Sequence, residues 1–152
     1  MKRRDFVGAV GTSILAGHLQ HTTPLARLDR IGLELYSVRD AMKADHDGTL
    51  AKVRDMGYAD VELLWSFNNF GRTPQQVRDV LRRLGLRAPS AHIAPDLLLK
   101  DWQQSLDAAR FLGHDYLIVP SLPGDTGKSL DRWRAWADNF NRAGEVARKS
   151  GI

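Results

Sequence analysis

Hydrophobic and polar positions after residue 30 follow a repeated pattern. Each repeat has an amphipathic stretch with helical spacing, then an apolar residue and a glycine, then a short apolar run typical of a strand. The junction glycines are 28, 28 and 38 residues apart, at Gly57, Gly85, Gly113 and Gly151. Glycine suits the left-handed position that ends a helix, and about 30 residues is the size of one strand-plus-helix unit. The pattern therefore predicts four such units in succession.

Two of the predicted helices carry clear sequence signals. Thr73 is suited to cap a helix that has Pro74 at its first position and Gln76 three residues after the cap. Its predicted buried stripe is Val77, Val80, Leu81 and Leu84. The last helix spaces its apolar residues three or four apart, which places Trp133 in the core with Leu130, Ala137, Phe140, Ala143 and Ala147.

The predicted strands are short and rich in apolar residues, as buried parallel strands are. They cover residues 31–36, 60–64, 86–93 and 116–120. Strands that alternate with helices pair in parallel through right-handed crossovers, so the fold class is α/β. The chain ends at Ile152, where the pattern requires a fifth strand.

The N-terminus has the features of an export signal rather than of a folded unit. Paired arginines, Arg3 and Arg4, precede Phe6 and a weakly apolar stretch over residues 8–17. These features resemble a twin-arginine signal over residues 1–26, which predicts a periplasmic or secreted protein with one domain over 27–152. Removing the signal lowers the net charge from +4 to about +2. A basic surface for nucleic acid is therefore not expected, nor is a membrane contact once the signal has been removed.

Candidate chemistry lies where the predicted strands end, because parallel strand-helix folds bind ligands at the carboxyl ends of their strands. Alternation places Glu34 and Tyr36 on one face of the first strand and Glu62 on the corresponding face of the second. A carboxylate inside a sheet is costly unless it is paired or meets a polar ligand. These glutamates are candidate functional residues, although each could instead pair with a base such as Arg39.

The third and fourth predicted strands add a histidine and two hydroxyl groups. Ser90 and His92 share a face of the third strand, and Ser121 follows the fourth. A neutral imidazole can bind a metal, hold a sugar hydroxyl or carry a proton, but His92 could also have a purely structural role. The chain has no cysteine, which excludes disulfides and thiolate metal sites.

In these segments the sequence resembles the sugar phosphate isomerase/epimerase family, the xylose isomerase-like (β/α)8 barrels, and in particular its exported bacterial members. The resemblance is carried by IGLELYSVR (31–39), GTLAKVRDMGYADVEL (48–63), APSAH (88–92), LGHDYLIVP (112–120) and NRAGEVARKSGI (141–152). It implies the first four βα units of a TIM barrel, an N-terminal half that stops before strand five.

The resemblance implies metal-dependent proton transfer on a hydroxy-carbonyl sugar or cyclitol in the full-length form. We expect Glu62 and His92 to be catalytic, and Tyr36, Glu34, Trp65 and Ser121 to contact the substrate. A divalent metal (Mn, Mg, Zn or Co) is expected for the full-length protein, with its ligands on later strands. No metal ligand is therefore assigned in this half, which is expected to be inactive and to bind no metal by itself.

The sequence also allows three other interpretations, which differ in activity or in fold. The endonuclease-like branch of the same fold is disfavoured by the near-neutral charge after signal removal. An exported sugar-binding module without enzymatic activity and a small flavodoxin-like binding domain are the remaining alternatives. Half a barrel would leave two open sheet edges and exposed apolar faces, so self-association of the chain is expected.

Overall fold

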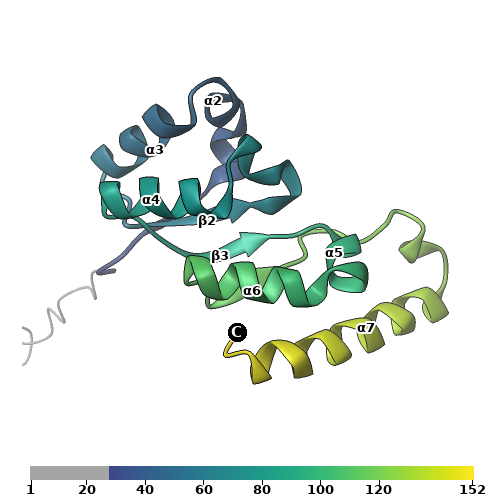
Figure 1. Ribbon diagram of the computed structural model, residues 1–152. Helices are drawn as coiled ribbons and strands as arrows, with labels where there is room; N and C mark the ends of the chain where they lie inside the picture. The colour runs from purple at the N-terminus through teal and green to yellow at the C-terminus, as the bar shows by residue number, and fades with distance from the viewer. Residues whose placement is uncertain (1–27) are drawn as a thin grey trace, which may run out of the picture.

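The computed structural model describes residues 28–152; the predicted export signal over 1–26 lies outside them. Four strands form one parallel sheet in the order β1-β2-β3-β4, and helices α3, α4, α6 and α7 follow one another along it in chain order (Figure 1). The strands are β1 (Gly32–Glu34), β2 (Asp60–Leu64), β3 (Arg87–His92) and β4 (Tyr116–Ile118). This is the predicted α/β arrangement, and the predicted strand 60–64 agrees at both ends.

Helices and short 3₁₀ segments connect the strands. After β1 come η1 (Leu35–Val38), α2 (Arg39–Ala44) and α3 (His46–Asp55). After β2 come η2 (Trp65–Gly71) and α4 (Pro74–Leu84), and after β3 come α5 (Pro95–Lys100) and α6 (Trp102–Leu112). The chain then passes from β4 through η3 (Thr126–Lys128) to α7 (Leu130–Lys149).

The pairing of β2 with β3 contains a one-residue irregularity. Asp60 lies opposite Arg87, whereas Glu62 lies opposite Ser90, so β3 gains one residue relative to β2 between these pairs. On the other side of β2, Glu62 lies opposite Glu34 in regular register. Glu34, Glu62 and Ser90 therefore form a row across three neighbouring strands.

The main core lies where β2 and β3 meet the helices α3 and α4. Val61 and Leu63 of β2 and Ala91 of β3 are buried there. Helix α4 begins as predicted, since Thr73 and Gln76 form a capping box and Val77, Val80 and Leu81 are buried. All four junction glycines have positive φ, between 64° and 96°, which is the conformation that glycine adopts most readily.

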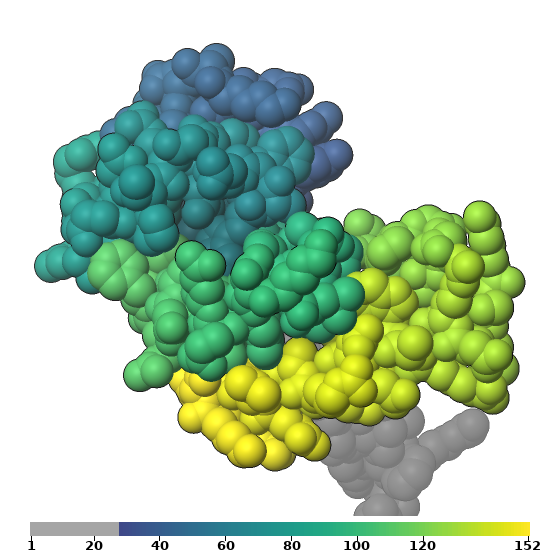
Figure 2. Space-filling view, turned by 45° about the vertical axis from the view of Figure 1, so that its right-hand side comes forward, coloured from purple at the N-terminus to yellow at the C-terminus, as the bar shows by residue number. Residues whose placement is uncertain are grey.

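The prediction for the last helix is wrong in part. Ala143 and Ala147 are buried, but Leu130 is 62 % exposed, Trp133 52 % and Phe140 38 %. In the part of the chain that the structure describes, no element covers the outer end of this stripe. Figure 2 shows α7, in yellow, at the margin of the molecule beside α6, in green. Trp133 is therefore a surface residue here.

The strand order disfavours the flavodoxin-like alternative. In that fold the first strand lies inside the sheet, and the order reverses at a switch point. Here β1 is an edge strand and the order runs without reversal. None of the helices within residues 28–152 is long and apolar enough to cross a membrane.

Candidate functional site

Glu34 ends β1 and begins the turn that follows it. Its Oε1 accepts a hydrogen bond from the backbone N–H of Tyr36, at 3.2 Å, so the carboxylate caps η1. The same oxygen lies 3.4 Å from Nδ1 of His92. Arg39, the alternative partner considered for Glu34, instead donates to the backbone oxygen of Tyr36 and lies over the Tyr36 ring. The Glu34 carboxylate thus points toward His92 on β3.

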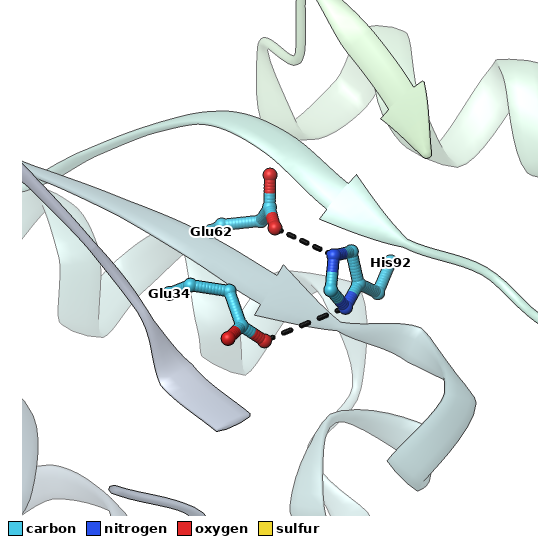
Figure 3. A group of neighbouring side chains, drawn as sticks. All are labelled: Glu34, Glu62 and His92. Carbon is cyan, nitrogen blue, oxygen red and sulfur yellow. Dashed lines mark ion pairs between the residues drawn. The ribbon is translucent and has the colours of Figure 1, made fainter. Parts of the chain in front are cut away.

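Glu62 has a partner on each carboxylate oxygen. Ser90 Oγ donates to Glu62 Oε2 at 2.5 Å, and Oε1 lies 2.7 Å from His92 Nε2. The side chains of Glu62 and His92 are each 18 % exposed, so neither is fully buried. In Figure 3 the imidazole of His92 lies between the two glutamates, with one ring nitrogen toward each. Both contacts are hydrogen bonds at once only when the ring carries two protons.

A cavity of about 380 Å³ opens beside this group at the carboxyl ends of the strands. Its volume falls in the range of small-molecule pockets, about 300–1,000 Å³. Glu34, Tyr36, His92 and Ser121 line it, which brings four of the six predicted site residues to one cavity. Glu62 adjoins it through its contact with His92.

Trp65, the remaining predicted site residue, lies elsewhere. Its ring packs on the buried His114, with 5.4 Å between the ring centroids, and it lines a separate cavity with residues of η2, α5 and α6. His114 Nδ1 lies 2.5 Å from the backbone oxygen of Ala88, and burial lowers the pKa of the His114 ring. Because a carbonyl oxygen only accepts, Nδ1 carries the proton when this ring is neutral.

Ser66 and Phe67 are among the lining residues that were not predicted from the sequence. They belong to η2, which follows the end of β2 directly, and Phe67 packs edge-on against Tyr36 with 5.8 Å between the ring centroids. Asn68, Asn69 and Phe70 then adopt φ between 45° and 56°, a left-handed conformation that is uncommon outside glycine. Their position after a strand end was one available signal.

Carboxylate and imidazole donors that could hold a metal ion are present at the same place. One ligand atom each from Glu34, Glu62 and His92 lies within 4.8 Å of the others. The donor types suit a divalent cation. In the observed arrangement, however, each nitrogen of His92 faces a different carboxylate, so the three side chains are engaged with one another.

Comparisons of the sequence with known proteins give no match. No protein-family model matches the chain. No curated protein matches its sequence either.

Solved structures do match the fold. Two are crystal structures described as sugar phosphate isomerase/epimerase proteins, both from Parabacteroides distasonis ATCC 8503. The first has 23 % identity and a TM-score of 0.67 over 88 % of this chain; the second has 25 % identity and a TM-score of 0.66 over 81 %. The chain spans about half of each, 52 % and 51 % of their lengths. The fold prediction, four βα units of a partial TIM barrel, is confirmed.

Proposed function

We propose that this chain forms the N-terminal half of a sugar isomerase/epimerase barrel and supplies an acid–base pair for proton transfer on a hydroxy-carbonyl sugar or cyclitol. The observation that carries the proposal is the contact between Glu62 Oε1 and His92 Nε2, at 2.7 Å, beside a cavity at the carboxyl ends of parallel strands. Ligands of barrels of this kind bind at that end. The solved neighbours have descriptions that agree with this reaction class.

The proposed reaction moves one proton between adjacent carbons. The Glu62 carboxylate takes the proton from the carbon next to the carbonyl, while the His92 ring donates a proton to the carbonyl oxygen. The electron pair of the broken C–H bond forms the C=C bond of an enediol. For the isomer, Glu62 returns the proton to the former carbonyl carbon while His92 takes the proton of the other enediol hydroxyl, whose oxygen becomes the new carbonyl. For the epimer, an acid of the rest of the ring delivers a proton to the opposite face of the first carbon, while His92 takes back the proton that it gave to the carbonyl oxygen.

Neighbouring groups position this pair and the sugar. Ser90 holds Glu62 Oε2, which turns Oε1 toward His92. Tyr36 and Ser121 lie on the cavity wall, where their hydroxyl groups can bond sugar hydroxyls. Trp65 lines another cavity, so we omit it from the proposed substrate contacts.

A divalent metal, when bound, would polarise the substrate carbonyl as a Lewis acid. Among the described residues Glu34, Glu62 and His92 have suitable donors, but these side chains are paired with one another. The proposed steps therefore use only the groups of the chain itself, and the catalytic metal ligands stay a prediction for the other half of the ring. Export by the twin-arginine route likewise stays a proposal.

Binding of ketoses tests the proposal directly. We would titrate the 152-residue chain with fructose and xylulose and follow the NMR signals of His92, Tyr36 and Ser121. We expect saturable shifts at these residues that weaken about tenfold or more in Glu62→Gln, because a hydrogen bond to a charged group is worth about 1.5–3 kcal/mol. Glu145→Gln, on the exposed face of α7, is the matched control.

Hydrogen exchange into the sugar, measured on a protein with the complete ring, separates an enzyme from a sugar-binding module. Deuterium that enters the sugar from D₂O at the carbon next to the carbonyl reports the first proton transfer. We expect this exchange only where the rest of the ring is also present, and we expect it to be lost in Glu62→Gln. Saturable binding with no exchange in a complete ring would favour the binding module, and no binding by the wild-type chain would contradict both.

A further inference from the structure

Two carboxylates meet on neighbouring strands of the sheet, and no lysine or arginine among residues 28–152 pairs with them. Glu34 and Glu62 lie opposite each other on β1 and β2. Among the ion pairs of the described residues, both glutamates pair only with His92. Adjacent carboxylates in a partly buried site are stabilised by a nearby positive charge, and a cation beside the three side chains would supply it.

We propose that Glu34, Glu62 and His92 form a divalent-cation site of their own on β1, β2 and β3, where a cation replaces the imidazole as the bridge between the two carboxylates. Two carboxylate oxygens and one imidazole nitrogen suit Mn²⁺, Co²⁺ or Zn²⁺. The absence of cysteine in the chain excludes a thiolate contribution. Three protein ligands beside an open cavity leave further coordination positions for water.

Both carboxylates are already oriented by groups outside the cluster. Ser90 Oγ holds Glu62 Oε2, and the backbone N–H of Tyr36 holds Glu34 Oε1. Apart from these contacts, Glu62 Oε1 meets only His92 among the hydrogen bonds and ion pairs of the described residues, and Glu34 Oε2 has no such partner there, so a cation would compete only with the imidazole. Hydrogen bonds of this kind orient metal ligands in proteins, and their loss commonly weakens metal affinity by about 10–100-fold. Ser90 is thus a positioning residue of the cation site.

The cation and the proposed proton transfer use the same atoms. A cation held by Glu62 Oε1 and a His92 nitrogen would occupy the lone pairs that the acid–base pair needs (Figure 3). The chain therefore either binds a cation at this row or presents Glu62 and His92 to a sugar. This inference does not depend on the proposed reaction, because cation binding is measured without a sugar.

Binding of Co²⁺ and Zn²⁺ alone to the 152-residue chain tests the site. Isothermal titration gives affinity and stoichiometry, and the visible absorption of bound Co²⁺ reports its ligands. We expect one cation per chain, at least tenfold weaker binding in Glu34→Gln, Glu62→Gln and His92→Gln, and about tenfold weaker binding in Ser90→Ala. Circular dichroism identifies any variant that does not fold, and Ser90→Ala and Glu34→Gln, which retain the imidazole, then carry the test.

Two controls exclude other donors. Glu145→Gln removes an exposed carboxylate of α7 and should leave the affinity unchanged. The chain also has His18 and His21 within the predicted signal, so the double variant His18→Gln/His21→Gln should bind like wild type. The proposal would be overturned if wild type bound no stoichiometric cation, or if the three ligand variants bound with wild-type affinity. Loss of binding in the double variant would overturn it as well. A chain that binds no cation could still bind a ketose, and a chain that binds no ketose could still bind a cation. The two titrations therefore test the two proposals separately.

Discussion

At the scale of single residues, the chain uses its histidines in two different ways. His92 is partly accessible and lies between two carboxylates, whereas His114 is buried beside Trp65 and bonds a backbone oxygen. Burial lowers the pKa of His114, and the hydrogen bond to Ala88 opposes this shift only in part. His114 is therefore a structural group whose neutral form the fold prefers.

The preference of the fold for neutral His114 predicts a stability change near neutral pH. In the unfolded chain the ring titrates near 6.5, and the folded-state pKa is lower, so below that pH the unfolded state binds more protons. We expect the free energy of unfolding to fall as the pH drops from about 7.5 toward 5.5, and to fall less in His114→Gln. Urea unfolding across this range measures both slopes, and equal slopes would refute the assignment.

At the scale of elements, the N-terminus of helix α4 is stabilised by hydrogen bonds that the local sequence predicts. The Thr73 hydroxyl accepts from the Gln76 backbone N–H, and the Gln76 side chain accepts from the Thr73 backbone N–H. Helix N-termini leave four N–H groups without intrahelical partners, and this capping box satisfies two of them.

Loss of the capping box predicts a measurable cost. Thr73→Ala should lower the free energy of unfolding by about 1 kcal/mol, the usual cost of losing a helix cap. Arg82→Ala, an exposed change in the same helix, should alter it by less than about 0.5 kcal/mol. Urea midpoints of the two variants and wild type provide the comparison. A Thr73→Ala protein as stable as Arg82→Ala would show that α4 is held by packing alone.

Elements with strong local signals could be predicted from the sequence, and those set by long-range contacts could not. The capping box and the apolar run at 60–64 agree with the structure because each depends on neighbours in sequence. The end of β1 was placed at residue 36, but the Glu34 carboxylate caps η1, so the strand ends there. Trp133 was misplaced because spacing identifies a stripe without saying whether another element covers it.

The sequence predicted which residues form the candidate site, but not the contacts between their side chains. Strand-end positions identified Glu34, Glu62 and His92, because such positions in parallel folds carry ligands. That His92 lies between the two glutamates depends on side-chain rotamers and strand register, which no local pattern contains. Phe67 lines the cavity just before the left-handed residues 68–70, and the pair Asn68-Asn69 followed by Gly71, which also has positive φ, was the local signal for that turn.

At the scale of the whole molecule, the sheet has two unpaired edges in the described part of the chain, β1 and β4. Tyr116 on β4 is 66 % exposed and lines a cavity together with Phe140 of α7, and Leu130 and Trp133 of the same helix are exposed as well. Open strand edges and grouped exposed apolar side chains promote association.

These edges predict self-association of the 152-residue chain. We expect sedimentation velocity at rising concentrations to show dimers or larger species, with a shift toward monomer in Tyr116→Lys, because a charge on an edge strand opposes pairing. Met56→Lys adds the same charge at a position 74 % exposed, after α3, and should not change the distribution. A cooperatively melting wild-type monomer at every concentration would contradict the expectation.

The irregular pairing of β2 with β3 has a chemical consequence. If the register set by Asp60 and Arg87 continued unchanged, Glu62 would face Pro89, which has no hydroxyl and no N–H. The one-residue offset places Ser90 there instead, and with it the donor that turns one oxygen of Glu62 toward His92. A single extra residue in β3 thus determines whether the Glu62 carboxylate has a hydroxyl donor that fixes its orientation.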